Sequence, residues 1–105
     1  MSAITKRDLI LLITQRLSEQ GTPIQQQDVA AVVQTFIEGV TDSLSSRRPV
    51  ILRNFGSFEV RDYRQKIGRN PKAPANDVII PARVGVKFKP GKNLAEKVRD
   101  GARSA

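Results

Sequence analysis

Residues 61–77, which read RDYRQKIGRNPKAPAND, lie between two segments in which apolar and polar residues alternate. Charged residues and turn formers dominate this stretch, and it holds too few apolar residues to build a core. The alternation resumes at Val78 and continues to Phe88, so the flanking segments have the period of β-strands that can pair. The sequence therefore predicts a long basic hairpin arm over about residues 61–78.

Positive charge is concentrated in the second half of the chain. Residues 1–45 hold three basic and five acidic side chains, whereas residues 46–105 hold fifteen basic and five acidic side chains. The formal net charge of the whole chain is +8 at pH 7, which indicates a polyanionic partner such as nucleic acid. The uneven placement favours the second half as the binding region, with a merely solvated charged face as the alternative.

The residue types that are missing exclude several classes of function. The sequence has no cysteine and no histidine, so it lacks thiolate ligands and the commonest metal ligand and general base. We therefore expect no metal, no cofactor and no enzymatic activity. The chain has no apolar run near the ~20 residues of a membrane span and no apolar signal-peptide core. We expect a cytosolic protein with no membrane partner and no small-molecule substrate.

Local signals predict two helices before the arm. Thr5 and Asp8 have the spacing of a capping box, so a first helix is expected over about 6–19, with Gly21 ending it. A second helix is expected from about Gln26. Its apolar residues form one broad stripe, made of Val29, Val32, Val33, Phe36, Ile37, Val40 and Leu44. Because the first helix cannot cover this stripe alone, either a partner chain or the later sheet must cover the rest.

Two short strands are expected next, over residues 50–53 and 58–61. In the turn between them, Gly56 is expected to adopt a positive φ. We expect Phe55 and Phe58 to pack on the helices, since apolar strand residues usually belong to a core. An exposed platform on which single-stranded bases stack is the alternative.

These elements predict one α+β domain over residues 1–105. A helical hairpin (1–46) precedes a three-stranded antiparallel sheet that carries the arm (47–89), and a short C-terminal helix follows (90–100). Residues 101–105 are expected to be frayed.

A hairpin with basic side chains on both strands suits the minor groove of duplex DNA, where shape and phosphate attraction count for more than a base code. We expect weak sequence specificity and binding that falls steeply with salt. Pro71 has a rigid apolar ring and no N–H, so it could enter a base step as a wedge and bend the duplex. Asn70-Pro71 is equally an ordinary turn signal, and the residues alone leave both interpretations open.

Three motifs follow one another along the second half of the chain. They read Phe55-Gly56-Ser57-Phe58, Gly68-Arg69-Asn70-Pro71-Lys72 and Phe88-Lys89-Pro90-Gly91-Lys92. In this order and spacing they resemble the HU and integration host factor family of bacterial DNA-bending proteins. The resemblance extends from Thr5 to about Arg99.

The resemblance implies an intertwined dimer, either a homodimer or a heterodimer with a related subunit, whose two arms embrace double-stranded DNA. It implies a nucleoid-associated cytoplasmic protein, a dimerisation role for residues 1–46, and Pro71 as the intercalating residue. Four phenylalanines become core or dimer residues, namely Phe36, Phe55, Phe58 and Phe88. The implied DNA-binding residues are Arg53, Arg61, Arg64, Lys66, Arg69, Asn70, Pro71, Lys72, Arg83, Lys87, Lys89 and Lys92.

The arm tip departs from the family pattern. Residues 73–77 replace the usual Thr-Gly type turn and make the tip one residue longer, so Pro74 competes with Pro71 as the apolar wedge. Asp62 and Asp77 also place negative charge in or near the arm.

Several functions remain open at this point. Within the family, the chain is either a sequence-tolerant protein that bends or compacts DNA, as HU does, or a site-preferring bender similar to integration host factor. Ile51 stands where a polar partner for Arg53 would be expected, which favours modest specificity. Outside the family pattern, a basic module for RNA or single strands and a module for an acidic protein are the alternatives.

Overall fold

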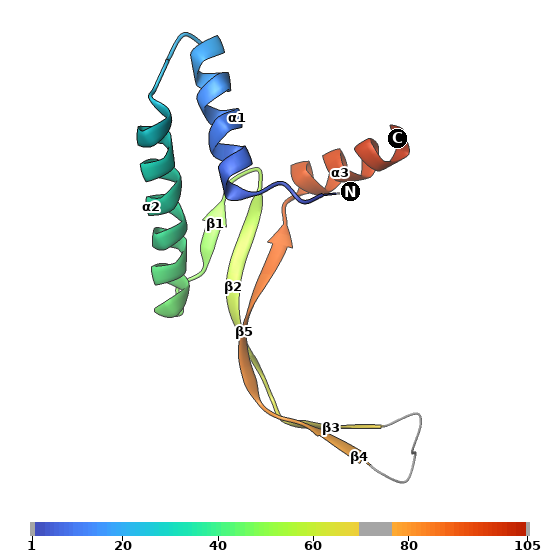
Figure 1. The fold of residues 1–105 in the computed structure, drawn as a ribbon. Coiled ribbons are helices and arrows are strands. Elements are labelled where there is room, and N and C mark those ends of the chain that lie inside the picture. The colour runs from blue at the N-terminus through green and yellow to red at the C-terminus, as the bar shows by residue number, and fades with distance from the viewer. Residues whose placement is uncertain (1, 70–76, 105) are drawn as a thin grey trace. The chain divides into compact units, whose positions relative to one another are not determined.

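The computed structural model describes residues 2–69 and 77–104. Within them the chain forms three helices and five strands, with two strands near the middle of the chain extending as a narrow hairpin (Figure 1). In chain order the elements are α1 (Lys6–Glu19), α2 (Gln26–Ser45), β1 (Val50–Leu52), β2 (Gly56–Tyr63), β3 (Lys66–Arg69), β4 (Asp77–Ile80), β5 (Arg83–Pro90) and α3 (Lys92–Ser104). The chain divides into two compact units, Met1–Asp42 and Ser43–Ala105.

α1 begins and ends where the local signals predict. The Thr5 Oγ1 accepts a hydrogen bond from the Asp8 backbone N–H (3.2 Å), and the Thr5 N–H donates to Asp8 Oδ2 (3.0 Å), which completes the capping box. Gly21 has a φ of 82° and ends the helix, with its N–H donating to the Ser18 carbonyl. The predicted bounds of this helix are confirmed.

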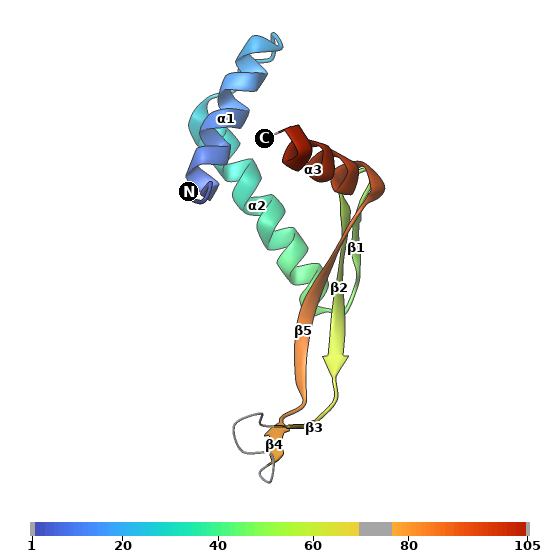
Figure 2. The same ribbon diagram turned by 90° about the vertical axis from the view of Figure 1, so that its right-hand side faces the viewer.

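The first unit is an antiparallel pair of helices, α1 and the greater part of α2 (Figure 2). A hydrogen bond from Lys6 Nζ to Gln34 Oε1 (2.7 Å) joins the two helices. Ile10 and Val29 are the only buried hydrophobic side chains among the described residues. Three other members of the α2 stripe are exposed, namely Val32 (68%), Phe36 (54%) and Ile37 (41%), and the remaining members are half-buried. This unit therefore leaves much of its apolar surface uncovered.

The second unit is built on the predicted three-stranded antiparallel sheet, and its strand order is β1-β2-β5. Phe58 pairs with Val50 on one side and with Phe88 on the other. The Phe88 ring lies 4.8 Å from the Phe58 ring and 5.5 Å from the Phe55 ring, measured between centroids. These three aromatic side chains pack together on the sheet, at distances typical of favourable ring contacts.

The turn between β1 and β2 corrects one prediction. The positive φ belongs to Asn54 (68°) and not to Gly56. Gly56 is needed for a different reason, because a Cβ atom there would lie 2.6 Å from both the Lys89 carbonyl oxygen and the Phe88 ring. Asparagine tolerates the left-handed region better than most residues, so the conformational demand and the packing demand fall on different residues.

The hairpin continues in one register from the sheet to the outer arm. Tyr63 pairs with Arg83, and Lys66 pairs with Ile80, so two residues on each strand separate β2 from β3 and β4 from β5. Pro81 lies in this interruption, where it removes one possible ladder donor. The ribbon changes direction at the interruption (Figure 1).

Two further bounds differ from prediction. The arm strands reach Ile80, two residues beyond the expected arm. α3 runs from Lys92 to Ser104, so it starts later than expected and continues beyond the expected end at residue 100. One glycine at Gly101 costs a helix only about 1 kcal/mol, which does not prevent good helix formers on both sides from continuing it. The α+β class, the helical pair, the three-stranded sheet and the hairpin are confirmed.

Candidate nucleic-acid interface

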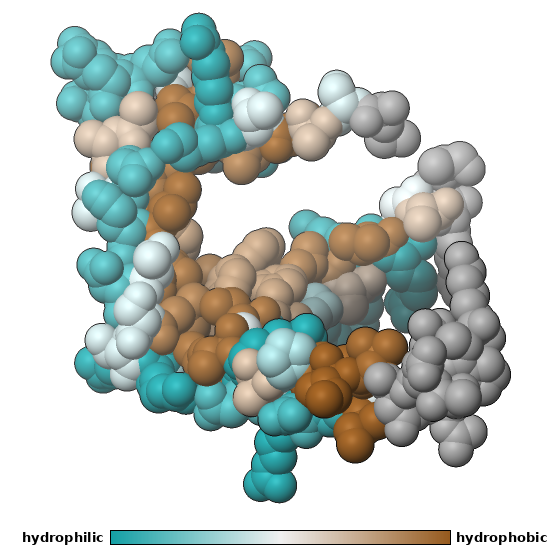
Figure 3. All heavy atoms as spheres, turned by 60° about the horizontal axis from the view of Figure 1, so that its bottom comes forward, coloured by the Kyte–Doolittle hydropathy of each residue, from teal (hydrophilic) through white to brown (hydrophobic). Residues whose placement is uncertain are grey.

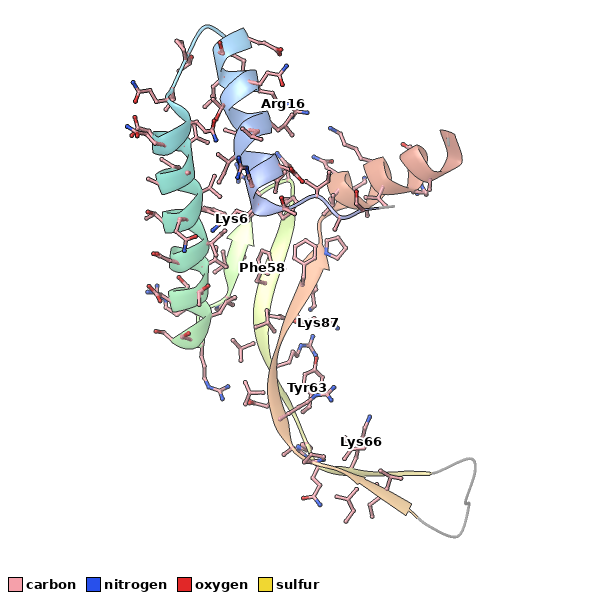
Figure 4. The ribbon with its side chains drawn as sticks, in the orientation of Figure 1. Lys6, Arg16, Phe58, Tyr63, Lys66 and Lys87 are labelled. Atoms are coloured by element: carbon pink, nitrogen blue, oxygen red, sulfur yellow. The ribbon has the colours of Figure 1, made fainter. Side chains whose placement is uncertain are left out.

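The register of β2 against β5 gives the sheet two different faces. Residues that pair across an antiparallel ladder share a face, and successive residues alternate between faces. One side, which we call the apolar face, carries Phe58, Val60, Val84, Val86 and Phe88. The other side, which we call the basic face, carries Arg61, Arg83, Lys87 and Lys89, together with Ser57, Glu59 and Tyr63. Phe58 and Lys87 show this division in Figure 4.

Glu59 is the acidic residue on the basic face. Its Oε1 lies 2.8 Å from Arg61 Nη2 and 3.2 Å from Lys89 Nζ. Hydrogen bonds from Arg61 and then from Lys89 hold the pKa of the Glu59 carboxyl below its usual value. Lys87 stands directly opposite Glu59 in the ladder. One carboxylate is therefore surrounded by three cationic side chains of the same face.

Arg83 and Tyr63 form the pair nearest the interruption of the ribbon. The guanidinium carbon of Arg83 lies 4.8 Å from the centre of the Tyr63 ring, within the range of a cation–π contact. This contact orders the Arg83 side chain without neutralising its charge, so Arg83 keeps its attraction for an anion.

Asp62 belongs to the apolar side of the ladder and is neutralised locally. Arg47 donates two hydrogen bonds to its carboxylate, at 3.1 and 3.2 Å. The hydrogen bond with Asp62, followed by the attraction of its charge, raises the pKa of Arg47 above its ordinary value. Arg47 reaches this position with a φ of 60°, at the turn that follows α2. The negative charge of Asp62 is thus not part of the basic face.

A second group of basic residues surrounds a depression of about 320 Å³ at the start of α3. Its lining includes Arg53, Lys89 and Lys92, with Asn54 and Asn93. Free N–H groups and the helix dipole make the first turn of a helix favourable for anions. The depression adjoins the basic face, because Lys89 belongs to both.

The implied DNA-binding residues fall into four groups. Arg61, Arg83, Lys87 and Lys89 share the basic face, and Arg53 and Lys92 line the depression. Arg64 lies in the interruption, and Lys66 lies in β3, where its side chain extends away from the ribbon (Figure 4). Arg69 ends β3, although its side chain lies outside the described part, as do residues Asn70, Pro71 and Lys72.

The outer arm is more apolar than the sequence analysis expected. Ile67 pairs with Ile79, and both side chains are largely exposed, as is Val78 to a lesser degree. Apolar side chains gather over the paired strands and continue outward along the arm in Figure 3. The β-branched side chains favour the extended backbone of the arm where no core supports it.

Sequence reasoning missed two residues that shape the site, Glu59 and Arg47. The spacing of Glu59 and Arg61, two apart on one strand, was the available signal for the first, because it places both side chains on one face. No sequence pattern marked Arg47, whose contact with Asp62 spans fifteen residues.

The three helices were also compared with the length and hydropathy that a membrane span requires. Among the described residues, no helix meets both requirements.

Comparison with known proteins bears directly on this site. The family model described as "Bacterial DNA-binding protein" matches residues 4–99. The probable DNA-binding protein HU of Chlamydia trachomatis is 35% identical over 105 residues, with both chains fully covered. Integration host factor subunit alpha of Haemophilus influenzae is 39% identical over 99 residues, covering 93% of this chain and 96% of that protein.

Solved structures agree with these matches. HU in an Anabaena HU–DNA cocrystal has a TM-score of 0.72 and 32% sequence identity, covering 90% of this chain and 96% of that one. An HU mutant from Thermotoga maritima has a TM-score of 0.58 and 29% identity, covering 90% and 97% of the two chains.

HU proteins and integration host factor subunits match this chain at similar identity, so the two branches are not separated. The expectation of a non-enzymatic, architectural DNA-binding protein is confirmed. The chain belongs to the bacterial DNA-binding protein family, together with HU and the subunits of integration host factor.

Proposed function

We propose that the basic face and the arm grip duplex DNA along its minor groove, and that the arm tip bends the duplex. The observation that carries the proposal is the register of β2 and β5, which gathers Arg61, Arg83, Lys87 and Lys89 on one face. Basic side chains on a narrow two-stranded ribbon attract phosphates on both walls of a groove that the ribbon can enter.

The depression at the start of α3 extends the same contact. Arg53 and Lys92 line this depression together with Lys89. A phosphate that follows those bound by the basic face would therefore contact two further cations and the positive end of α3. Because binding uses phosphates rather than base edges, we propose low to modest sequence specificity. Ile51, exposed in β1 beside Arg53, offers no hydrogen bond to a base.

Bending is assigned to the tip, where Pro71 and Pro74 are candidate wedges. Partial unstacking costs a few kcal/mol per base step, and additional phosphate contacts along a bent duplex offset that cost. The tip lies outside the described residues, so this assignment rests on the motif Gly68-Arg69-Asn70-Pro71-Lys72 and on the arm that carries it.

A dimer is the proposed functional unit, and residues 1–46 are its proposed dimerisation part. Val32 and Phe36 on α2, and Val84 and Val86 on the apolar face, are all more than half exposed. Large exposed apolar residues in this number indicate a protein surface that another chain covers. The partner is a second copy or a related subunit, and the assembly associates with DNA of the nucleoid.

A competition experiment tests the proposed ligand. The full chain is bound to a labelled duplex. Unlabelled duplex DNA, single-stranded DNA and RNA of equal length are then added as competitors at one salt concentration. We expect duplex DNA to compete best. Stronger competition by single-stranded DNA or by RNA would overturn the proposal. A second measurement compares the affinities for random and AT-rich duplexes at matched salt, and equal affinities would exclude a strong site preference.

A further inference from the structure

Glu59 lies between two cations of the basic face, Arg61 and Lys89. Its Oε1 accepts a hydrogen bond from Arg61 Nε at 2.9 Å, and it lies 2.8 Å from Arg61 Nη2 and 3.2 Å from Lys89 Nζ. A phosphate oxygen makes the same kinds of contact with these groups. The carboxylate and a phosphate therefore compete for Arg61 and Lys89.

We propose that Glu59 sets the affinity and salt dependence of DNA binding as an internal competitor, which releases Arg61 and Lys89 to the phosphates when the duplex arrives. The inference rests on the proposed function, because it assigns the basic face to DNA. It goes beyond that proposal by giving an acidic residue, and not a basic one, control over how strongly the face binds.

The surroundings of Glu59 explain why exchange is feasible. The side chain of Glu59 is 29% exposed, and those of Arg61 and Lys89 are 44% and 50% exposed, so water screens these ion pairs and a stronger anion can displace the carboxylate. Lys87 lies directly opposite Glu59 in the ladder. The charged groups facing Glu59 are thus Arg61 on its own strand and Lys87 and Lys89 on the next.

Asp62 provides a matched comparison on the same strand. It has the same charge as Glu59, but the register places it on the other side of the ladder, where it pairs with Arg47. Glu59→Gln and Asp62→Asn therefore change the net charge of the chain equally. Only the first removes a competitor from the basic face.

The test measures binding of both full-length variants to one fluorescent duplex of mixed sequence by anisotropy, across a salt series. For Glu59→Gln we expect an affinity gain of about tenfold at low salt, because no ion pair has to break before Arg61 and Lys89 contact phosphates. The gain should shrink as the salt concentration rises, because salt screens the ion pairs that Glu59 makes in the free wild-type protein. For Asp62→Asn we expect a change within about twofold, because solvent screens a charge on the other face. Equal effects of the two variants, or none from Glu59→Gln, would overturn the inference.

A second set of variants distinguishes competition for Arg61 and Lys89 from a general effect of net charge on DNA binding. Arg61→Ala/Lys89→Ala should weaken binding, and adding Glu59→Gln to that background should have little further effect, because the cations that Glu59 held are absent. An undiminished gain from Glu59→Gln in that background would contradict the competition. If Arg61→Ala/Lys89→Ala leaves the affinity unchanged, the assignment of the basic face to DNA fails instead.

The pH dependence of the binding affinity provides a further test, which does not depend on the net charge of the variant alone. A carboxylate that loses Arg61 and Lys89 to phosphates binds a proton more readily than it does in the free protein. Wild-type binding should therefore tighten as the pH falls from 7 towards 5 by more than binding of Glu59→Gln does. Identical pH profiles for the two proteins would count against the exchange.

Discussion

Gly56 lies directly against the ring of Phe88, because a Cβ atom at Gly56 would stand only 2.6 Å from Phe88 Cζ. The Lys89 carbonyl oxygen is equally close to that position, so both a side chain and the backbone would have to move. We expect Gly56→Ala to lower the free energy of unfolding by about 1–3 kcal/mol, the usual cost of overpacking. Urea unfolding followed by circular dichroism measures this change.

Gly101→Ala is the control for that substitution. Among the described residues outside the adjacent helix backbone, no atom lies within 4 Å of the Cβ position at Gly101, which stands inside α3. Alanine there should stabilise the protein by up to about 1 kcal/mol through helix propensity. Equal destabilisation by the two substitutions would show that the contact with Phe88 is not the cause.

Asn54 carries the backbone strain of the turn that Gly56 was expected to carry. Its φ of 68° is costly for a residue with an ordinary side chain. Asn54→Gly should therefore leave the stability nearly unchanged, whereas Asn54→Ala should lower it by about 1 kcal/mol. Thermal unfolding of both variants tests this order, and a more stable alanine variant would contradict it.

The capping box of α1 makes stability depend on pH. The pKa of Asp8 is lowered from its ordinary value of 3.8, chiefly by the hydrogen bond from the Thr5 backbone and then by the Thr5 side chain. A group with a lowered folded-state pKa stabilises the fold above its unfolded-state pKa, and this stabilisation is lost as the pH falls through the folded-state value. The difference in melting temperature between wild type and Asp8→Asn should thus stay constant from neutral pH to about 5 and vanish in stronger acid. A difference that grows on acidification would contradict the assignment.

The exposed apolar residues of α2 predict a dimer in solution. Native mass spectrometry or light scattering of the isolated protein should give twice the 11.6 kDa of one chain. Phe36→Asp should shift the population to single chains, since it places a charge on a surface that a partner covers. Ile4→Asp, at a residue that is 70% exposed outside the helices, is the control and should leave the dimer intact. A single-chain mass for the wild type would require another cover for this surface.

The parts of the fold that the sequence predicts well are those with local causes. Thr5 and Asp8 specify the start of α1 within four residues of chain, and Gly21 specifies its end, so those bounds are correct. The alternation from Val78 to Phe88 likewise locates the strands of the hairpin.

The parts that the sequence does not predict depend on residues far apart in the chain. The need for glycine at position 56 depends on where the Phe88 ring packs, more than thirty residues later, whereas the positive φ of the turn belongs to Asn54. The roles of Glu59 and Arg47 depend on how distant parts of the chain pair. Lys89 lies beside Glu59, and Asp62 lies beside Arg47. The basic composition predicts a polyanionic partner. The pairing register of β2 and β5 is needed to show which basic residues share one face of the sheet.

The most direct test of the account is the end-to-end distance of a duplex when the protein binds it. Fluorescence energy transfer between dyes at the two ends should increase on addition of the wild-type protein, because the bent duplex brings its ends together. Pro71→Ala should bind with nearly the same affinity and produce a smaller increase, which would assign the wedge to Pro71 rather than to Pro74. Saturated binding with unchanged energy transfer would contradict the claim that this chain bends DNA.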